Sequence, residues 1–93
     1  MEDEEGRLTA HKSTYFKELW RDKAGKLHRL NGPAMITLSS GDMTWYRHGK
    51  LHRDDGPALD WPSDGTEEWY RDGKLYEPTA HELIAWKMKK KEG

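Results

Sequence analysis

Short stretches in which apolar and polar residues alternate fill the middle of the chain, and each is closed by residues typical of turns. Alternation with a period of two indicates strands with one buried face. The pattern predicts strands over residues 17–21, 26–28, 34–38, 43–47, 50–52, 58–61, 66–71 and 74–76. The dipeptide Asp72-Gly73 is among the strongest hairpin signals, and His48-Gly49 precedes it by one unit. Because the strands are short and sequential, we predict an antiparallel meander.

After residue 77 the period changes from that of a strand to that of a helix. Thr79 and Glu82 have the spacing of a capping box, in which each side chain binds the backbone of the other residue. One apolar face would be formed by Ala80, Leu83, Ile84 and Met88, with Trp86 at its border. We therefore predict a helix over about residues 80–91 that buries this face on the open end of the sheet.

The chain repeats itself every 24 residues. Residues 25–29 return at 49–53, residues 32–34 at 56–58 and residues 45–47 at 69–71, and a third, decaying copy begins at Gly73. Such a period indicates one supersecondary unit used several times. The fold class is therefore mainly β, a meander of repeated hairpins with a C-terminal capping helix. Its parts are an acidic, mobile segment (1–14), the repeat sheet (15–77), and the helix with a basic tail (78–93).

Composition narrows the class of protein. Of the 93 residues, 33% are hydrophobic and five are Trp, so we expect a thin sheet whose core is aromatic. The formal net charge of −1 gives no global attraction to DNA or anionic lipid. The absence of cysteine excludes a disulfide framework and a thiolate zinc site. No apolar run is long enough for a membrane span, and we expect a soluble protein of the cytoplasm, or of the host cytoplasm if it is viral.

The repeated His-Arg pairs, residues 28–29 and 52–53, have three interpretations. Each imidazole could bond a backbone group of a turn while the arginine reaches the following aspartate or a carbonyl group, which is a structural role. Alternatively the pairs could form a recognition surface, or the histidines could bind metal. We favour the structural role, because two histidines without a third ligand at fixed spacing make a poor zinc site. We expect no metal and no cofactor.

Aromatic residues recur on both faces of the predicted strands. Trp20, Trp45 and Trp69 occupy one position per unit and are expected in the core, although an aromatic ladder could also stack bases. The neighbouring tyrosines should point to the opposite face, because side chains alternate along a strand. We therefore predict a recognition surface, rich in the residue types of interface hot spots, that consists of Tyr46, Arg47, Arg53, Trp61, Tyr70 and Arg71.

Catalysis has little support in the sequence. There is no serine in a nucleophile elbow and no glycine-rich phosphate loop, and the glycines are explained by turns. The paired acids at 54–55 and 67–68 are adjacent in sequence rather than facing one another. We expect that the protein is not an enzyme.

The unit Trp-Tyr-x-x-Gly-Lys-x-His-Arg-x-x-Gly-Pro-Ala, at residues 45–58, resembles a short repeat of small proteins from tailed bacteriophages and large viruses. It is loosely similar to MORN repeats, whose units are also β-hairpins built around Tyr or Trp and Gly. The resemblance covers about residues 17–90 and implies a hairpin-repeat architecture. MORN repeats serve scaffolding and lipid contact, while the phage repeats share no single activity. In the third copy Tyr76-Glu77 replaces His-Arg, so we expect this copy to be a cap.

Together these observations predict a non-enzymatic module that binds another protein through the exposed face of its sheet. The resemblance implies a viral accessory protein that inhibits a host defence or gene-expression factor. The alternative is binding of nucleic acid or an anionic surface by the basic cluster at 87–91 together with Arg47, Arg53 and Arg71. A further alternative is homo-oligomerisation, because an open meander has exposed edges.

Overall fold

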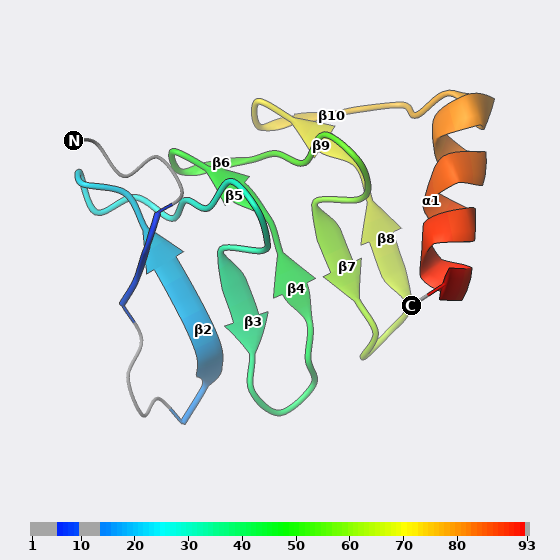
Figure 1. Cartoon of the computed structure of the whole chain (residues 1–93). Helices are drawn as coiled ribbons and strands as arrows, with labels where there is room; N and C mark the ends of the chain where they lie inside the picture. The colour runs from blue at the N-terminus through cyan, green and yellow to red at the C-terminus, as the bar shows by residue number, and fades with distance from the viewer. Residues whose placement is uncertain (1–5, 10–13, 93) are drawn as a thin grey trace.

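The structure is a computed structural model that describes residues 6–9 and 14–92. It is mainly β, with an antiparallel meander followed by one helix, as the sequence predicts. Six strands form the large sheet, in the order β1-β2-β3-β4-β7-β8 (Figure 1). Their bounds are Arg7–Leu8, Phe16–Arg21, Met35–Thr37, Met43–Thr44, Leu59–Trp61 and Thr66–Glu68, respectively.

The remaining strands form two separate hairpins that cross one end of the large sheet (Figure 1). The first hairpin consists of β5 (Tyr46–Arg47) and β6 (Lys50–Leu51). The second consists of β9 (Tyr70–Arg71) and β10 (Lys74–Leu75). The helix α1 (Ala80–Glu92) lies alongside β8, at the end of the large sheet opposite β1 (Figure 1). The chain therefore builds two layers.

The prediction of single strands over 43–47 and 66–71 is wrong, because both break at their tryptophan. The N–H of Trp45 donates to the Ala58 carbonyl beside the large sheet, whereas its carbonyl accepts from His52 N–H at the hairpin. Trp20 makes the equivalent bonds: its N–H donates to the Ala34 carbonyl, and its carbonyl accepts from His28 N–H. Each of these tryptophans is thus a corner whose two backbone groups serve different layers.

Two other segments differ from the sequence prediction. Residues 26–28 form no strand and contribute an isolated bridge between Arg21 and Leu27. The strand β1 lies inside the segment 1–14 that we predicted to be mobile, and it pairs with β2. The other residues of the acidic segment, 1–5 and 10–13, lie outside the described residues.

The predicted hairpin turns have the expected backbone. Both central residues have positive φ, with 48° and 83° at His48 and Gly49 and 52° and 80° at Asp72 and Gly73. Positive φ at both positions defines the turn type that suits the twist of a hairpin. The type of both turns is therefore specified by local sequence.

The buried residues gather where the two layers meet. Ala34, Ala58 and Pro57 are almost completely inaccessible, and His28 and Arg53 are buried beside them. All belong to the repeated His-Arg-x-x-Gly-Pro-Ala segment, and Trp69 and Trp86 complete the buried hydrophobic core. Of the three tryptophans expected in the core, Trp69 is buried, whereas Trp20 and Trp45 are half-buried. Among the described residues, no helix is long and apolar enough to cross a membrane.

Candidate functional site: a row of hairpins

We call the two hairpins, together with residues 26–28 on which the first one rests, the hairpin row. Neighbouring members are joined by backbone hydrogen bonds. Gly49 N–H donates to the Leu27 carbonyl at 2.7 Å, and Gly73 N–H donates to the Leu51 carbonyl at 2.8 Å. In the opposite direction, Arg29 N–H donates to Tyr46 and Arg53 N–H to Tyr70. Each hairpin is therefore held by the unit before it.

The repeated histidines brace the same junctions. Nδ1 of His28 accepts the N–H of His48 at 2.9 Å, and Nδ1 of His52 accepts the N–H of Asp72 at 3.0 Å. The His28 and His48 rings also stack, with 3.9 Å between their centroids. The structural interpretation of the histidines is thereby confirmed, because each binds a backbone group of the following turn. Within the described residues, no cluster of three or more His, Cys, Asp or Glu could hold a metal ion.

The repeated arginines pack on the corner tryptophans. The Arg29 guanidinium lies 4.0 Å from the Trp20 ring centroid, and that of Arg53 lies 3.9 Å from Trp45. Arg53 also donates to the Pro57 carbonyl and to Asp55. A cation over an aromatic face is attracted by the ring quadrupole, and more strongly where water is excluded. The arginines of the repeat are therefore structural, as predicted.

The register of each hairpin separates its side chains into two faces. Tyr46 is paired with Leu51, and Arg47 with Lys50. The second hairpin repeats this arrangement, with Tyr70 opposite Leu75 and Arg71 opposite Lys74. Directly opposed residues share a face of an antiparallel pair. One face of the row therefore carries tyrosine and leucine, and the other carries arginine and lysine.

The arginine face is engaged inside the molecule. Arg47 forms an ion pair with Asp54 at 3.4 Å. Arg71 donates to the Asp54 carbonyl and to Glu82 of α1, and its guanidinium lies 3.9 Å from the Tyr76 ring centroid. Burial raises the pKa of Asp54, but the hydrogen bond from His52 and the nearby positive charge of Arg47 outweigh burial, and the net pKa lies below its usual value. On the opposite face Leu75 is exposed, and Tyr46, Leu51 and Tyr70 are half-buried.

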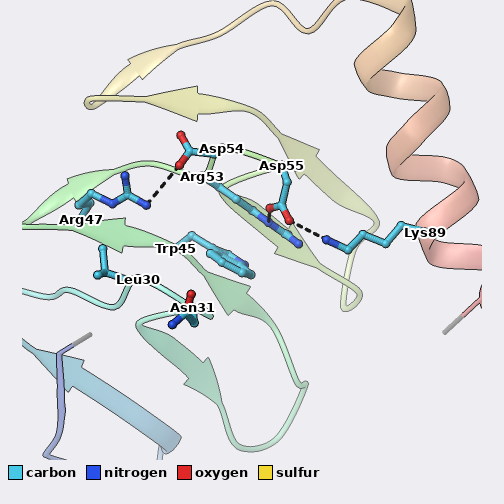
Figure 2. Close-up of a pocket in the computed structure, with 8 residues that line it drawn as sticks. All are labelled: Leu30, Asn31, Trp45, Arg47, Arg53, Asp54, Asp55 and Lys89. Carbon is cyan, nitrogen blue, oxygen red and sulfur yellow. Dashed lines mark hydrogen bonds and ion pairs between the residues drawn. The ribbon is translucent and has the colours of Figure 1, made fainter. Parts of the chain in front are cut away.

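A cleft of about 390 Å³ opens beside the arginine face (Figure 2). Its walls are formed by Leu30, Asn31, Trp45, Arg47, Arg53, Asp54, Asp55 and Lys89. The charged groups pair with one another across it, since Lys89 binds Asp55 at 2.6 Å and Arg47 binds Asp54. The Trp45 Nε1 and Arg47 Nε atoms have no partner within the described part of the chain, but both are buried. The cleft thus presents ion pairs rather than free donors.

The helix packs through a different face from the predicted one. Trp86 is buried, whereas Leu83, Ile84 and Met88 are exposed, the last two by 58% and 60%. The reason is the polarity of the surface that α1 covers. Lys89 pairs with Asp55, Lys90 pairs with Glu67, and the Trp86 ring centroid lies 4.7 Å from the Arg53 guanidinium. Because this surface is polar, the lysines and one tryptophan of α1 contact it, and the aliphatic residues face away.

Electrostatics at this contact agree with its geometry. Burial raises the pKa of Asp55, but the hydrogen bonds from Lys89 and Arg53 outweigh burial, and the net pKa lies below its usual value. Burial and the adjacent Glu67 raise the pKa of Asp60. The hydrogen bond to Glu67 raises the pKa of Lys90. The acidic strands β7 and β8 therefore favour a basic helix face.

The capping box is present as predicted. Thr79 N–H donates to Glu82 at 2.8 Å, and Glu82 N–H donates to the Thr79 hydroxyl at 3.2 Å. Glu82 also accepts from the Tyr76 hydroxyl at 2.9 Å and from Arg71. Its pKa is lowered, first by the Thr79 N–H and next by the Tyr76 hydroxyl. One carboxylate thus joins the helix start to the last hairpin.

The structure does not bring the six predicted recognition residues onto one surface. Tyr46 and Tyr70 lie on one face of the hairpin row, and Arg47 and Arg71 lie on the other. Arg53 is buried, with 7% of its surface exposed, and is therefore not an exposed contact residue. Trp61 lies in β7 of the large sheet, where its indole N–H donates to the Thr44 hydroxyl.

Sequence reasoning missed two residues of the tyrosine face, Leu51 and Leu75. Leu51 is half-buried, and Leu75 is 74% exposed. Each lies opposite the tyrosine of its own hairpin. The sequence contains the information needed to pair each leucine with its tyrosine, because a two-residue hairpin loop fixes which residues are opposed.

The chain matches no protein-family model, and no curated protein or solved structure is significantly similar to it.

Proposed function

We propose that the protein is a non-enzymatic module that binds another protein through the tyrosine face of the hairpin row. The observation that carries the proposal is the register, which places Tyr46, Leu51, Tyr70 and Leu75 on one face, with Leu75 74% exposed. Tyrosine supplies a large amphipathic contact area at low conformational cost and is frequent at binding hot spots. The opposite face is engaged with Asp54 and Glu82.

The resemblance to phage repeat proteins supports a narrower form of this proposal. In that form the partner is a host defence or gene-expression factor, and occupation of the tyrosine face inhibits it. The structure supports the general form through a rigid scaffold, because every hairpin is fixed by backbone bonds to its predecessor. A surface held in this way loses little entropy when it binds.

Binding of nucleic acid or an anionic surface is the competing function. Most of the basic residues suggested for it are engaged: Arg53 is buried, and Arg47, Arg71, Lys89 and Lys90 each contact an acidic side chain, whereas Lys87 is exposed. A phosphate would have to displace these partners. We therefore favour a protein partner.

The test compares three immobilised proteins exposed to the same host lysate: wild type, Tyr46→Ala/Tyr70→Ala, and Lys50→Ala/Lys74→Ala. The last is the matched control, since both of its lysines are exposed on the opposite face. We expect the tyrosine variant to melt cooperatively and to lose the retained protein, with about 2 kcal/mol or more lost per anchor. The lysine variant should retain it.

Ionic strength separates the two functions. Retention through an apolar face should survive added salt, whereas phosphate binding weakens steeply as salt rises. A folded tyrosine variant that still retains the same protein would contradict the proposed surface. Retention that nuclease treatment or moderate salt abolishes would favour the competing function.

A further inference from the structure

The last hairpin ends the row with an open edge. At each inner junction, the leucine carbonyl of one unit accepts a turn N–H from the next unit, as Leu27 and Leu51 do. Two residues further along, the arginine N–H donates to the tyrosine carbonyl of that next unit, as Arg53 does to Tyr70. The corresponding groups of the third unit are the Leu75 carbonyl and the Glu77 N–H. Within the described part of the chain, the structure gives neither group a partner.

Both groups point away from the rest of the hairpin. Tyr76 N–H donates inward, to the Trp69 carbonyl at 2.9 Å. Because backbone groups alternate in direction along a strand, those of residues 75 and 77 face outward. Leu75 is also 74% exposed, whereas Leu27 and Leu51, each covered by the next hairpin, are half-buried. The edge therefore lacks both its hydrogen bonds and its apolar cover.

The pattern of free groups is complementary to itself. If two antiparallel strands are related by a two-fold axis at residue 76, Leu75 of each strand lies opposite Glu77 of the other, so the same pair occurs twice. Opposed residues of this type exchange both of their N–H to carbonyl bonds. The Leu75 carbonyl of each copy would accept from the Glu77 N–H of the other copy. The edge can therefore pair with the same edge of a second copy of this chain.

The other end of the row cannot receive this edge. There, Arg21 bridges Leu27 on one side and pairs with Arg7 of β1 on the other. A head-to-tail fibre would need that end to be open. A closed, two-fold pair of last hairpins is the arrangement that remains.

We propose that two copies of this chain associate through the edge formed by residues 75–77, paired antiparallel about a two-fold axis at Tyr76. The ladder is short, so the dimer dissociates on dilution. Its hydrogen bonds come from the backbone of this edge. Leu75 also belongs to the tyrosine face, but Tyr46 and Tyr70 lie outside the proposed ladder.

Sedimentation velocity over a concentration series of the full chain tests this proposal. We expect the wild type to pass from monomer to dimer as its concentration rises. Leu75→Glu places a carboxylate opposite Glu77 of the other copy at two positions per dimer, and association should weaken about fivefold. Leu75→Lys places an opposite charge there, and association should strengthen instead. Leu38→Glu, at another exposed leucine, is the control and should leave association unchanged.

A second variant acts on the backbone. Glu77→Pro removes the donor N–H, while residue 77 already precedes Pro78 and so favours an extended conformation. This variant should be monomeric and should melt as the wild type does. Amide exchange adds a readout at one atom, because the Glu77 N–H should be protected in concentrated solution and exchange freely in dilute solution.

Each alternative outcome overturns the proposal. It fails if the wild type is monomeric at all concentrations. It also fails if the dimer is indifferent to the sign of the charge at residue 75, or if it persists in Glu77→Pro. The variant Tyr46→Ala/Tyr70→Ala should still form dimers, and so loss of partner binding and loss of dimerisation can be told apart.

Discussion

The first and second units carry the same His-Arg-x-x-Gly-Pro-Ala motif, but the arginine of this motif has different surroundings in each. Arg29 stacks on Trp20, and its side chain is 21% exposed. Arg53 lies within stacking distance of two tryptophans, Trp45 and Trp86, and its side chain is 8% exposed. The second tryptophan comes from α1, which the first unit has no equivalent of. The motif by itself leaves its arginine partly exposed, and packing of the helix buries the second one.

The glycine of the motif is also more closely surrounded in the second unit than in the first. A Cβ at Gly32 would approach the Arg29 guanidinium carbon at 2.8 Å, with the other close atoms from the same side chain. A Cβ at Gly56 would approach Arg53 at 2.9 Å and also a Trp86 ring atom at 3.0 Å. Both glycines make room for an arginine, but at residue 56 that arginine has little space to move.

The largest difference between the units should follow removal of the arginine. Both arginines donate to the proline carbonyl of their own motif, but Arg53→Ala also removes a buried guanidinium that lies near two rings, and we expect a loss of about 3 kcal/mol of unfolding free energy. Arg29→Ala, its matched counterpart, should cost about 1 kcal/mol because that site is partly solvated. Chemical denaturation measures both values. Equal losses would show that Trp86 adds nothing to the second stack.

A smaller difference should appear when each glycine gains a methyl group. Gly56→Ala forces Arg53 and Trp86 apart, and we expect a cost of about 1–3 kcal/mol, typical of overpacking. Gly32→Ala displaces the end of one half-exposed side chain, and it should cost less than about 1 kcal/mol. Thermal melts of the two variants compare them directly. If Gly32→Ala were the more destabilising of the two, the arginine of the first unit would be the more tightly packed one.

The smallest effect concerns pH at the start of α1. The folded pKa of Glu82 lies below the ordinary 4.5. Its ionised form therefore stabilises the fold above that ordinary value, and the contribution is lost as pH falls through the lower, folded pKa. We expect helical circular dichroism to decline on acidification below 4.5, and the decline to be reduced in Glu82→Gln. The first two units lie outside this contact, so amide exchange at Trp20 should change less than at Thr79.

Much of this fold could be predicted from local sequence. Asp72-Gly73 specifies its turn because both positions require positive φ, and Thr79 with Glu82 specifies the helix start. The break at Trp45 could not be predicted, because no proline or glycine marks it. It arises from partners far along the chain, Ala58 for the N–H and His52 for the carbonyl.

The candidate site was predicted only in part. Alternation along one strand was used to separate the tyrosines from the tryptophans, but the strands break at Trp45 and Trp69, and Tyr46 and Tyr70 are half-buried. The same rule also separates Tyr46 from Arg47, although we placed them on one surface. For the helix, an apolar stripe suggested the buried face. The surface to be covered bears Asp55 and Glu67, and a pattern within the helix holds no information about the charge of its neighbour.

The corner tryptophans have a consequence for how such a chain can change in length. Every 24-residue unit contributes strands to the large sheet and one member to the hairpin row, and its corner ties the two together. Duplication of a whole unit lengthens both layers by one step and gives each new hairpin a predecessor to rest on. A single residue added in a hairpin turn is accommodated, because Trp20 and Trp45 are 25 residues apart, whereas Trp45 and Trp69 are 24 apart, and both Trp20 and Trp45 keep their corner bonds. A longer insertion between a corner and its partners would shift the strands of the large sheet relative to the hairpin row. Growth by whole units is therefore the route that keeps every corner in register.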